Sequence, residues 1–388
     1  MKTVAVIFGG KSAEHDVSIV TAIASIIAPL ELSKKYRVEA VYVAKNGAWF
    51  WDDKLKNIDM FTSGKIDKFV AKARPASAQF DGGMTLVRAG RLTRRQKIDV
   101  VFPSMHGTYG EDGSLMGLLD MAGVPYVGCG LEASVLAMDK AVTKQVAVAN
   151  GLPSNKFLVY STKELANDAL PIFKQITKEL KYPLFVKPVH LGSSIAISRV
   201  TNDTELRNAM EVAARFDDKI IVEEAVPNLI EVTLPIIGND DLTPAYLEQP
   251  LINAESFFDF EAKYMGQGGK KTGGGKAGGK RGAQGYSKIP AEIPKDLYNK
   301  AEAVGLSVYR ALGCSGIARV DMLINSKTKE VFVNEVNPLP GSLYAHNWRA
   351  KGISNVELVT RLVALAEERS LARQKLSTAF STNFLKQF

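Results

Sequence analysis

Residues 313–321 read Gly-Cys-Ser-Gly-Ile-Ala-Arg-Val-Asp, and residues 331–337 read Val-Phe-Val-Asn-Glu-Val-Asn. Each segment is mainly apolar and carries acidic or amide side chains, a pattern that is typical of strands with one polar edge. The residues between them, Asn-Ser-Lys-Thr-Lys at 325–329, have the composition of a hairpin turn. We therefore expect two paired strands that bring Asp321 close to Glu335 and Asn337.

These three side chains offer hard oxygen ligands that leave room for water and phosphate. No His or Cys cluster accompanies them, so the set favours a magnesium–nucleotide site over a zinc site. Solvent-facing strand residues are the alternative interpretation of such a trio. Arg319 on the first strand and the rigid corner Pro-Leu-Pro-Gly at 338–341 favour a ligand site instead.

Length and composition limit the class of protein. The chain has 388 residues, 46% hydrophobic and 23% charged, as expected of a globular protein with two or three domains. Its two cysteines are far apart in sequence, so a disulfide framework is not expected. A reducing compartment is the expected location. The apolar run at 4–8 is too short for a signal peptide, and no run approaches about 20 apolar residues, so no membrane span is expected.

The net charge of +8 suggests nucleic-acid binding until the charges are located. Residues 266–285 contain ten Gly, five Lys or Arg and no acidic residue. Most of the excess positive charge therefore belongs to one Gly/Lys-rich loop, which we expect to be mobile. The folded body gives little support for nucleic acid as a partner.

The chain divides into three expected α/β domains and a tail. Residues 1–128 predict a doubly wound, Rossmann-like parallel sheet, whose strand ends carry Gly9-Gly10 and His106-Gly107. Residues 129–223 predict one helix over 133–149 and strands over 183–188 and 195–200. Residues 224–367 contain the Gly/Lys-rich loop 266–285, a helix over 295–312 and a closing helix over 355–367; the tail is 368–388.

Three further patterns have both a structural and a functional interpretation. Glu14 begins a predicted helix, where it suits the positive end; alternatively, it holds a substrate ammonium group. Lys187 ends a strand and is followed by Gly192-Ser193-Ser194, which together favour phosphate binding. Glu223 and Glu231 flank an apolar hinge and are either solvent-facing strand residues or ligands for adenine and ribose.

In their order along the chain, these motifs resemble those of D-alanine–D-alanine ligases, members of the ATP-grasp superfamily. The motifs that carry the resemblance are Glu14, His106-Gly107 with Gly110-Glu-Asp-Gly113, Met138-Asp139-Lys140, Lys187-Pro with Gly192-Ser193-Ser194, Glu223 and Glu231, Glu261-Ala-Lys263-Tyr264, Arg319-Val-Asp321 and Asn334-Glu335-Val-Asn337. Each motif is weak alone, but eight in order are specific. The resemblance implies a three-domain ATP-grasp fold with ATP between the central and C-terminal domains.

The resemblance also implies the reaction, the cofactors and the residue roles. Two D-alanines would be joined through an acyl phosphate for peptidoglycan synthesis in the cytoplasm, with ATP and two Mg²⁺ ions, or Mn²⁺ in their place. The implied metal ligands are Asp321, Glu335 and Asn337. The implied ATP-binding residues are Lys140, Lys187, Ser194, Glu223, Glu224, Val226, Glu231 and Lys263. The implied catalytic residues are Glu14, Ser193, Tyr264 and Arg319, and the implied substrate-binding residues are His106, Gly341 and His346.

Two departures from the family pattern leave alternatives open. The Gly/Lys repeat replaces a loop of varied composition, so a non-catalytic protein that binds polyanions is a remote alternative. His346 stands where the family usually has Ser, so the second substrate is D-alanine or, alternatively, D-serine, D-lactate or another amino acid. Small amino acids are the expected partners, without nucleic acid or membrane, and a homodimer, common in the family, is an open alternative to a monomer.

Overall fold

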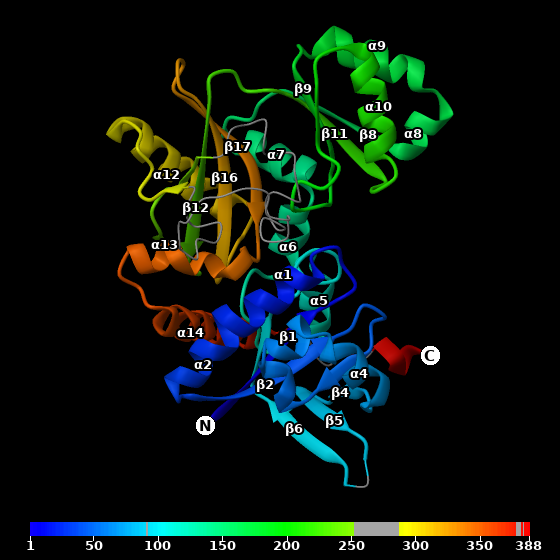
Figure 1. The fold of residues 1–388 in the computed structure, drawn as a ribbon, viewed down its shortest axis with the longest axis vertical. Helices are drawn as coiled ribbons and strands as arrows, with labels where there is room; N and C mark the ends of the chain where they lie inside the picture. Colours follow the sequence, from blue (N-terminus) through cyan, green and yellow to red (C-terminus); the bar gives the residue numbers. More distant parts are fainter. Residues whose placement is uncertain (91, 252–286, 378–381, 383) are drawn as a thin grey trace, which may run out of the picture.

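The computed structural model describes residues 1–90, 92–251, 287–377, 382 and 384–388. Three four-stranded sheets follow one another along these residues, and helices cover their faces (Figure 1). The expected α/β class with a parallel sheet at the N-terminus is confirmed. The predicted site residues Lys263 and Tyr264 and the Gly/Lys-rich loop 266–285 lie outside the described residues.

The N-terminal sheet has the strand order β3-β2-β1-β7. Strand β1 pairs in parallel with both β2 and β7, and β3 is an antiparallel edge strand. These strands are β1 (Lys2–Gly9), β2 (Tyr36–Val43), β3 (Trp49–Trp51) and β7 (Val100–Pro103); a separate antiparallel sheet contains β4 (Ala76–Phe80), β5 (Met84–Arg88) and β6 (Arg94–Ile98). The short helices of this region are η2 (Asp53–Lys56), α3 (Asp59–Thr62), α4 (Lys65–Lys72) and α5 (Ser114–Met121).

One long helical stretch follows β1 and consists of α1 (His15–Val20), the π-helical η1 (Thr21–Ile27) and α2 (Ala28–Ser33). This stretch of 19 residues, with a mean hydropathy of 1.5, is long and apolar enough to cross a membrane. However, 56% of its most apolar 18-residue segment is buried inside the protein. Its buried side chains, including Ile26 and Leu30, pack in a core with β1 and β2. This packing accounts for its apolar sequence, as for other core helices.

The helix expected over 133–149 is interrupted, and the expectation of one helix is wrong. The structure has α6 (Leu131–Met138) and α7 (Lys140–Ala149) instead. Asp139 adopts an extended conformation between them, and its Oδ1 accepts a hydrogen bond of 2.8 Å from the Val142 backbone N–H. This N-cap starts a new helix, so Lys140 lies at the first position of α7.

The central sheet is antiparallel, with the order β10-β9-β11-β8. Its strands are β8 (Phe157–Ser161), β9 (Leu184–Pro188), β10 (Ser198–Val200) and β11 (Lys219–Glu224), and the helices α8 (Thr162–Asn167), α9 (Ala169–Glu179) and α10 (Asp203–Ala213) accompany them. The strand expected over 195–200 is shortened. Ser193, Ser194 and Ala196 have φ angles of 54°, 58° and 55°, a left-handed conformation that strands do not contain.

The C-terminal sheet is also antiparallel, with the order β13-β12-β16-β17. Its strands are β12 (Leu229–Ile237), β13 (Thr243–Pro244), β16 (Ile317–Asn325) and β17 (Glu330–Asn337), and a small pair contains β14 (Gln249–Pro250) and β15 (Ser287–Lys288). Helices α6, α7 and α12 (Lys295–Ala311) share one hydrophobic core with this sheet. Helix α7 thus lies between the C-terminal and central sheets (Figure 1).

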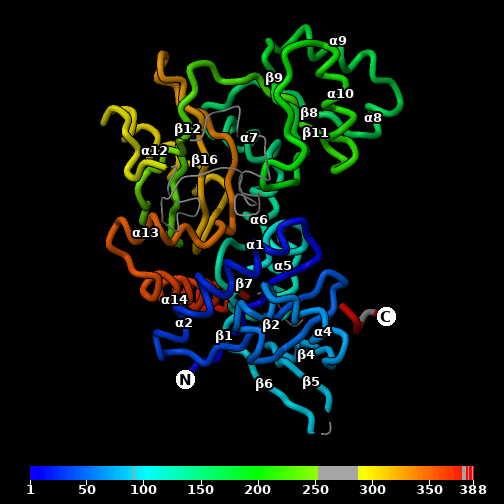
Figure 2. Tube along the Cα trace, in the orientation of Figure 1, coloured from blue at the N-terminus to red at the C-terminus, as the bar shows by residue number. Residues whose placement is uncertain are grey.

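The last helices return to the N-terminal sheet, as Figure 2 shows for α14 beside α2. After β17 the chain forms η4 (Gly341–Tyr344), α13 (Ala345–Ala350), α14 (Asn355–Gln374) and η5 (Phe384–Gln387). Helix α14 continues beyond the expected end at Glu367. The Arg369 guanidinium donates 2.8 and 2.6 Å hydrogen bonds to the Tyr126 carbonyl and the Ser315 hydroxyl, which anchors the additional turns.

Candidate functional site

The pairing of β16 with β17 brings most of the predicted metal-site residues together. Asp321 pairs with Glu335, and Arg319 pairs with Asn337, which confirms the proximity expected from the sequence. The guanidinium of Arg319 contacts both carboxylate oxygens of Asp321, at 2.7 and 2.5 Å, and lies 4.0 Å from Glu335 Oε1. Burial raises the pKa of the Asp321 carboxyl, and the Arg319 charge opposes that rise.

A β-bulge makes this arrangement possible. Val331 and Val333 are buried, so strict alternation along β17 would also turn Glu335 and Asn337 into the core. The register shifts between Asp321 and Met322, where Asn334 is the additional residue of β17. Beyond the bulge the alternation is reversed, and Val336 becomes the buried residue.

Lysine side chains reach this edge from two other elements. Lys140, at the start of α7, lies 3.5 Å from Glu335 Oε2 and donates a 2.6 Å hydrogen bond to the Leu191 carbonyl. Lys187, on β9, lies 3.4 Å from Asn334 Oδ1. The predicted phosphate-binding and metal-binding residues therefore meet at one place in the described structure.

Glu223 lies in a buried cluster of charges on the same face of the central sheet as Lys187. Its Oε2 is 3.0 Å from Lys187 Nζ and 3.6 Å from Lys144 Nζ. Burial opposes the ionisation of Glu223, but Lys144 and then Lys187 outweigh it and hold the carboxyl pKa below its usual range. Glu223 Oε1 is buried and has no hydrogen-bond partner among the described residues.

Sequence reasoning missed Lys144 and Asn155. Lys144 is completely buried, and its Nζ donates hydrogen bonds of 2.7 Å to Asn155 Oδ1 and 3.3 Å to the Val333 carbonyl. Burial lowers the pKa of Lys144 to about 8, which Glu223 partly offsets. Lysines are rarely buried, so only its position one helical turn after Lys140 could have indicated a place on the same face of α7.

The remaining predicted nucleotide ligands, other than Lys263, differ in burial and in their contacts. Glu224 accepts a 2.9 Å hydrogen bond from the Lys181 N–H at its side chain, and its carbonyl accepts a 2.8 Å bond from Asn155 Nδ2. Glu231 is half-buried on β12, opposite Leu323. Val226 is buried, and Ser194 lies in the left-handed stretch after β9.

A second group of predicted residues surrounds Glu14 at the start of α1. The Ser193 hydroxyl donates a short hydrogen bond to Glu14 Oε1, which brings the N-terminal and central parts of the chain together. A Cβ atom added to Gly107 or Gly192 would lie 3.0 Å from Glu14 Oε2, so both glycines permit the close approach. Burial, and then the nearby Glu111, raises the pKa of Glu14.

Thr21 links this group to the turn after β17. Its Oγ1 accepts a 3.0 Å hydrogen bond from the Ser342 N–H and lies 3.1 Å from His106 Nε2. The ring of His106 is buried. Sequence reasoning missed Thr21, although it follows Glu14 by two helical turns and is a polar residue in an apolar stretch.

His346 lies in α13, after Gly341, and is engaged by an acidic residue that sequence reasoning also missed. Its Nε2 is 2.8 Å from Glu248 Oε2, which also accepts a 3.2 Å hydrogen bond from Asn347 Nδ2. The Tyr344 ring lies 5.0 Å from the His346 ring and 5.1 Å from the Arg319 guanidinium. The Tyr344 ring therefore lies close both to His346 and to Arg319, which contacts Asp321.

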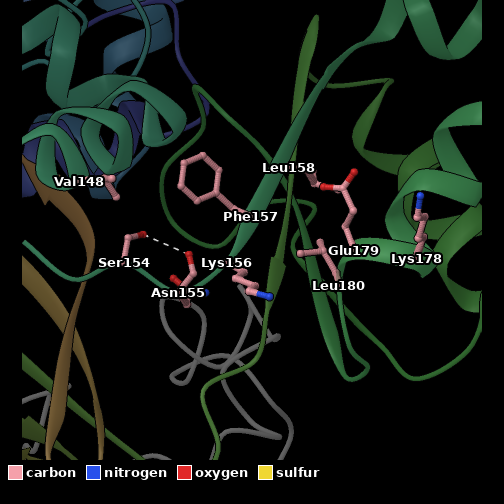
Figure 3. Close-up of a pocket in the computed structure, with 9 residues that line it drawn as sticks. All are labelled: Val148, Ser154, Asn155, Lys156, Phe157, Leu158, Lys178, Glu179 and Leu180. Carbon is pink, nitrogen blue, oxygen red and sulfur yellow. Dashed lines mark hydrogen bonds between the residues drawn. The ribbon is translucent and has the colours of Figure 1, made fainter.

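A cavity of about 560 Å³ lies beside the Lys144 cluster (Figure 3). It lies between the end of α7, the start of β8 and the end of α9, and Asn155 belongs to both its wall and the cluster. Its lining residues are Val148, Ser154, Asn155, Lys156, Phe157, Leu158, Lys178, Glu179 and Leu180. Among the described residues, none of the predicted site residues lines this cavity.

The chain matches two family models. Residues 3–129 match the model described as D-ala D-ala ligase N-terminus, and residues 146–364 match D-ala D-ala ligase C-terminus. The curated D-alanine–D-alanine ligase of Acetivibrio thermocellus is 35% identical over 384 residues, covering 95% of this chain and 96% of the relative. That of Chlorobaculum tepidum is 36% identical over 392 residues, with 96% and 99% covered.

Solved structures show the same similarity. The D-alanine–D-alanine ligase from Coxiella burnetii superposes with a TM-score of 0.78 at 27% identity and covers 96% of each chain. The VanG D-Ala:D-Ser ligase from Enterococcus faecalis superposes with a TM-score of 0.75 at 29% identity, covering 94% of this chain and 99% of that one.

The buried charge cluster predicts a loss of stability when Glu223 is neutralised. In Glu223→Gln, Lys144 keeps its buried position but loses the carboxylate that offsets its burial, and we expect a loss of about 3 kcal/mol in the free energy of unfolding. Urea denaturation measures this change. The matched control is Glu224→Gln on the same strand, whose half-exposed side chain predicts a change of roughly 0.5 kcal/mol or less. Equal midpoints for the two variants would contradict the assignment.

Proposed function

Since the chain belongs to the D-alanine–D-alanine ligase family, we propose that it joins two D-alanines into D-alanyl-D-alanine in an ATP-dependent reaction. The product serves peptidoglycan precursor synthesis, and the proposed location is the cytoplasm, where ATP is available and free cysteines such as Cys129 and Cys314 persist. The observation that carries the proposal is the contact of Lys140 with Glu335, because it joins the phosphate-binding and metal-binding residues at one edge of β17.

The residues at this edge fit magnesium. Asp321 and Glu335 offer carboxylate oxygens from directly paired positions, and Asn337 adds an amide oxygen, which is the donor set that Mg²⁺ prefers. The Asn337 oxygen accepts a 3.1 Å hydrogen bond from the Leu339 N–H and retains a second lone pair. Magnesium bound there would neutralise negative charge on the phosphates.

The central sheet fits the base and phosphates of ATP. Adenine has an exocyclic amino group that can donate to a carboxylate, and the buried Glu223 Oε1 lacks a donor among the described residues. Lys187 and Lys140 supply positive charge for the phosphates, with Lys263 and Ser194 as further ligands. Glu224 and Val226 would line the adenine site and Glu231 would bind the ribose.

The first chemical step uses the residues around Glu14. We assign the carboxylate of Glu14, supported by Ser193, to the ammonium group of the first D-alanine, with His106 as a further substrate-binding residue. The substrate carboxylate, held in this position, attacks the γ-phosphorus, releases ADP and becomes an acyl phosphate. Lys140 and Lys187 stabilise the charge that develops during this transfer.

The second step joins the two substrates. The amine of the second D-alanine attacks the acyl carbon, and inorganic phosphate leaves as the tetrahedral intermediate collapses. Arg319 and the backbone near Gly341 stabilise the oxyanion, and we assign Tyr264 a catalytic role in the same step. We assign His346 to the side of the second substrate, and its Nε2 lies 2.8 Å from Glu248 Oε2.

The similarity to a D-Ala:D-Ser ligase and the His346 side chain together support a second candidate, a ligase that uses D-serine or another second substrate. The test is phosphate release from ATP and Mg²⁺ with D-alanine alone, then with D-serine, D-lactate or L-alanine added, and identification of products by mass. We expect D-alanine alone to support turnover and yield D-alanyl-D-alanine. If turnover requires another acceptor, that acceptor is the second substrate in place of D-alanine. The absence of turnover with any of these acceptors would contradict the ligase assignment.

The metal assignment predicts that Glu335→Gln abolishes turnover at ordinary Mg²⁺ concentrations, because the variant loses one of two carboxylate ligands. The measurement is phosphate release as a function of Mg²⁺ concentration, and partial recovery is expected at high Mg²⁺. Glu330→Gln is the matched control on β17, because Glu330 is exposed and accepts its hydrogen bond from the Thr328 hydroxyl. Activity of Glu335→Gln equal to that of the control would refute the assignment.

A further inference from the structure

His190 lies between two aspartates at the base of the loop that carries Ser193. Its backbone N–H donates a 2.6 Å hydrogen bond to Asp217 Oδ2, and its Nδ1 is 2.9 Å from Asp217 Oδ1. Its Nε2 lies 3.4 Å from Asp139 Oδ2. Both ring nitrogens therefore face carboxylates, an arrangement that the protonated ring satisfies because only then do both nitrogens donate.

The two aspartates belong to the segments that carry the nucleotide-binding residues. Asp139 is the N-cap of α7 and directly precedes Lys140, and Asp217 precedes β11, which carries Glu223. Lys219 Nζ donates a 2.6 Å hydrogen bond to Asp139 Oδ2, so α7 and β11 are also connected directly. His190 adds the loop after β9 to this connection.

The loop needs such an anchor because its backbone is strained. Ser193 and Ser194 have φ angles of 54° and 58°, and left-handed conformations of non-glycine residues persist only where the surroundings enforce them. Two contacts hold the left-handed conformation of this loop: Lys140 Nζ donates to the Leu191 carbonyl, and the Ser193 hydroxyl donates to Glu14. His190 holds the first residues of the loop, directly after the end of β9.

We propose that His190 is a positioning residue: clamped between Asp139 and Asp217, its protonated imidazole holds the Gly192–Ser194 loop and Lys140 in register for phosphoryl transfer. The proposal rests on the proposed function for its catalytic consequence. No substrate, cofactor or metal contact is assigned to His190, whose effect is exerted through Ser193 and Lys140.

The electrostatics of the clamp agree with its geometry. The contacts with Asp139 and then with Asp217 raise the pKa of His190 to about 9. The charged groups around the ring are Asp139 at the start of α7, Asp217 and Asp218 before β11, and Lys219 on β11. Because the folded pKa lies above the ordinary value of 6.5, the clamp is intact at neutral pH and is lost as the pH rises through about 9.

His190, Asp217 and Asp218 also have the spacing of a metal-binding group. The contacts favour the clamp, because both ring nitrogens lie against carboxylates, Nδ1 against Asp217 and Nε2 against Asp139. An imidazole that binds a metal uses a neutral, unprotonated nitrogen, whereas two carboxylates favour the protonated ring.

Proton NMR tests the clamp without any assumption about the reaction. The chain has four histidines, and the His190 resonance is the one that disappears in His190→Gln. We expect that resonance to titrate with a midpoint near pH 9, and we expect Asp217→Asn to move the midpoint toward 6.5. A midpoint near 6.5 in the unmodified protein, or one that Zn²⁺ shifts at equimolar concentration, would overturn the proposal.

The ratio of kcat/KM between the unmodified enzyme and His190→Gln tests the catalytic consequence. Loss of a charged hydrogen bond predicts a ratio of about tenfold at pH 7, falling toward one above about pH 10 as the unmodified enzyme loses its proton. A role in packing alone predicts a ratio that does not change with pH, which would contradict the proposal. Arg361→Gln, which breaks a surface ion pair with Glu357 on α14, is the matched control and should leave the rate unchanged at every pH.

These measurements separate the two proposals. If the unmodified protein shows no turnover with any acceptor, the proposed function fails while the NMR titration still tests the clamp. If turnover is observed and the His190 midpoint lies near 6.5, the clamp fails and the ligase assignment stands.

Discussion

The bulge at Asn334 controls which face of the C-terminal sheet carries charge. Val331, Val333, Glu335 and Asn337 occupy alternate positions, so an unbroken strand would bury both the valines and the carboxylate in the same core. The additional residue reverses the alternation after Val333. Glu335 can then lie opposite Asp321, on the edge that Lys140 and Arg319 also reach. Without this local irregularity Glu335 would not lie beside Asp321 on the polar edge of the sheet.

The charges of the candidate site, on the C-terminal sheet and on the neighbouring central sheet, are paired within the protein. Arg319 covers Asp321, Lys140 lies against Glu335, and Lys144 and Lys187 surround Glu223. Charges that are removed from water need partners of opposite sign, and each carboxylate in this region has one. Nucleotide and metal binding would exchange these partners rather than create new charge, because phosphate can take over the lysines and magnesium the carboxylates. Under the proposed function, this exchange would account for the close alternation of cationic and acidic residues in the site.

Sequence patterns predicted the parts of the fold that follow from local periodicity. The β16–β17 hairpin and the proximity of Asp321 to Glu335 followed from alternating apolar residues and a turn between them. The break at Asp139 was missed because residues 131–149 contain no Gly or Pro, and only a side-chain cap interrupts the helix. The left-handed conformation of Ser193 and Ser194 has no signature in the sequence, since serine does not favour that conformation. Lys144, Thr21 and Glu248 act through contacts between distant segments, which no local pattern encodes.

In the proposed reaction a substrate carboxylate is activated as an acyl phosphate at the edge formed by β16 and β17. The most direct measurement supplies D-alanine labelled with ¹⁸O in both carboxylate oxygens and determines the isotopic mass of the released inorganic phosphate. Attack of the carboxylate on the γ-phosphorus leaves one substrate oxygen on phosphorus, so we expect each phosphate formed with the dipeptide to carry one ¹⁸O atom. Unlabelled phosphate released together with labelled dipeptide would rule out an acyl-phosphate intermediate.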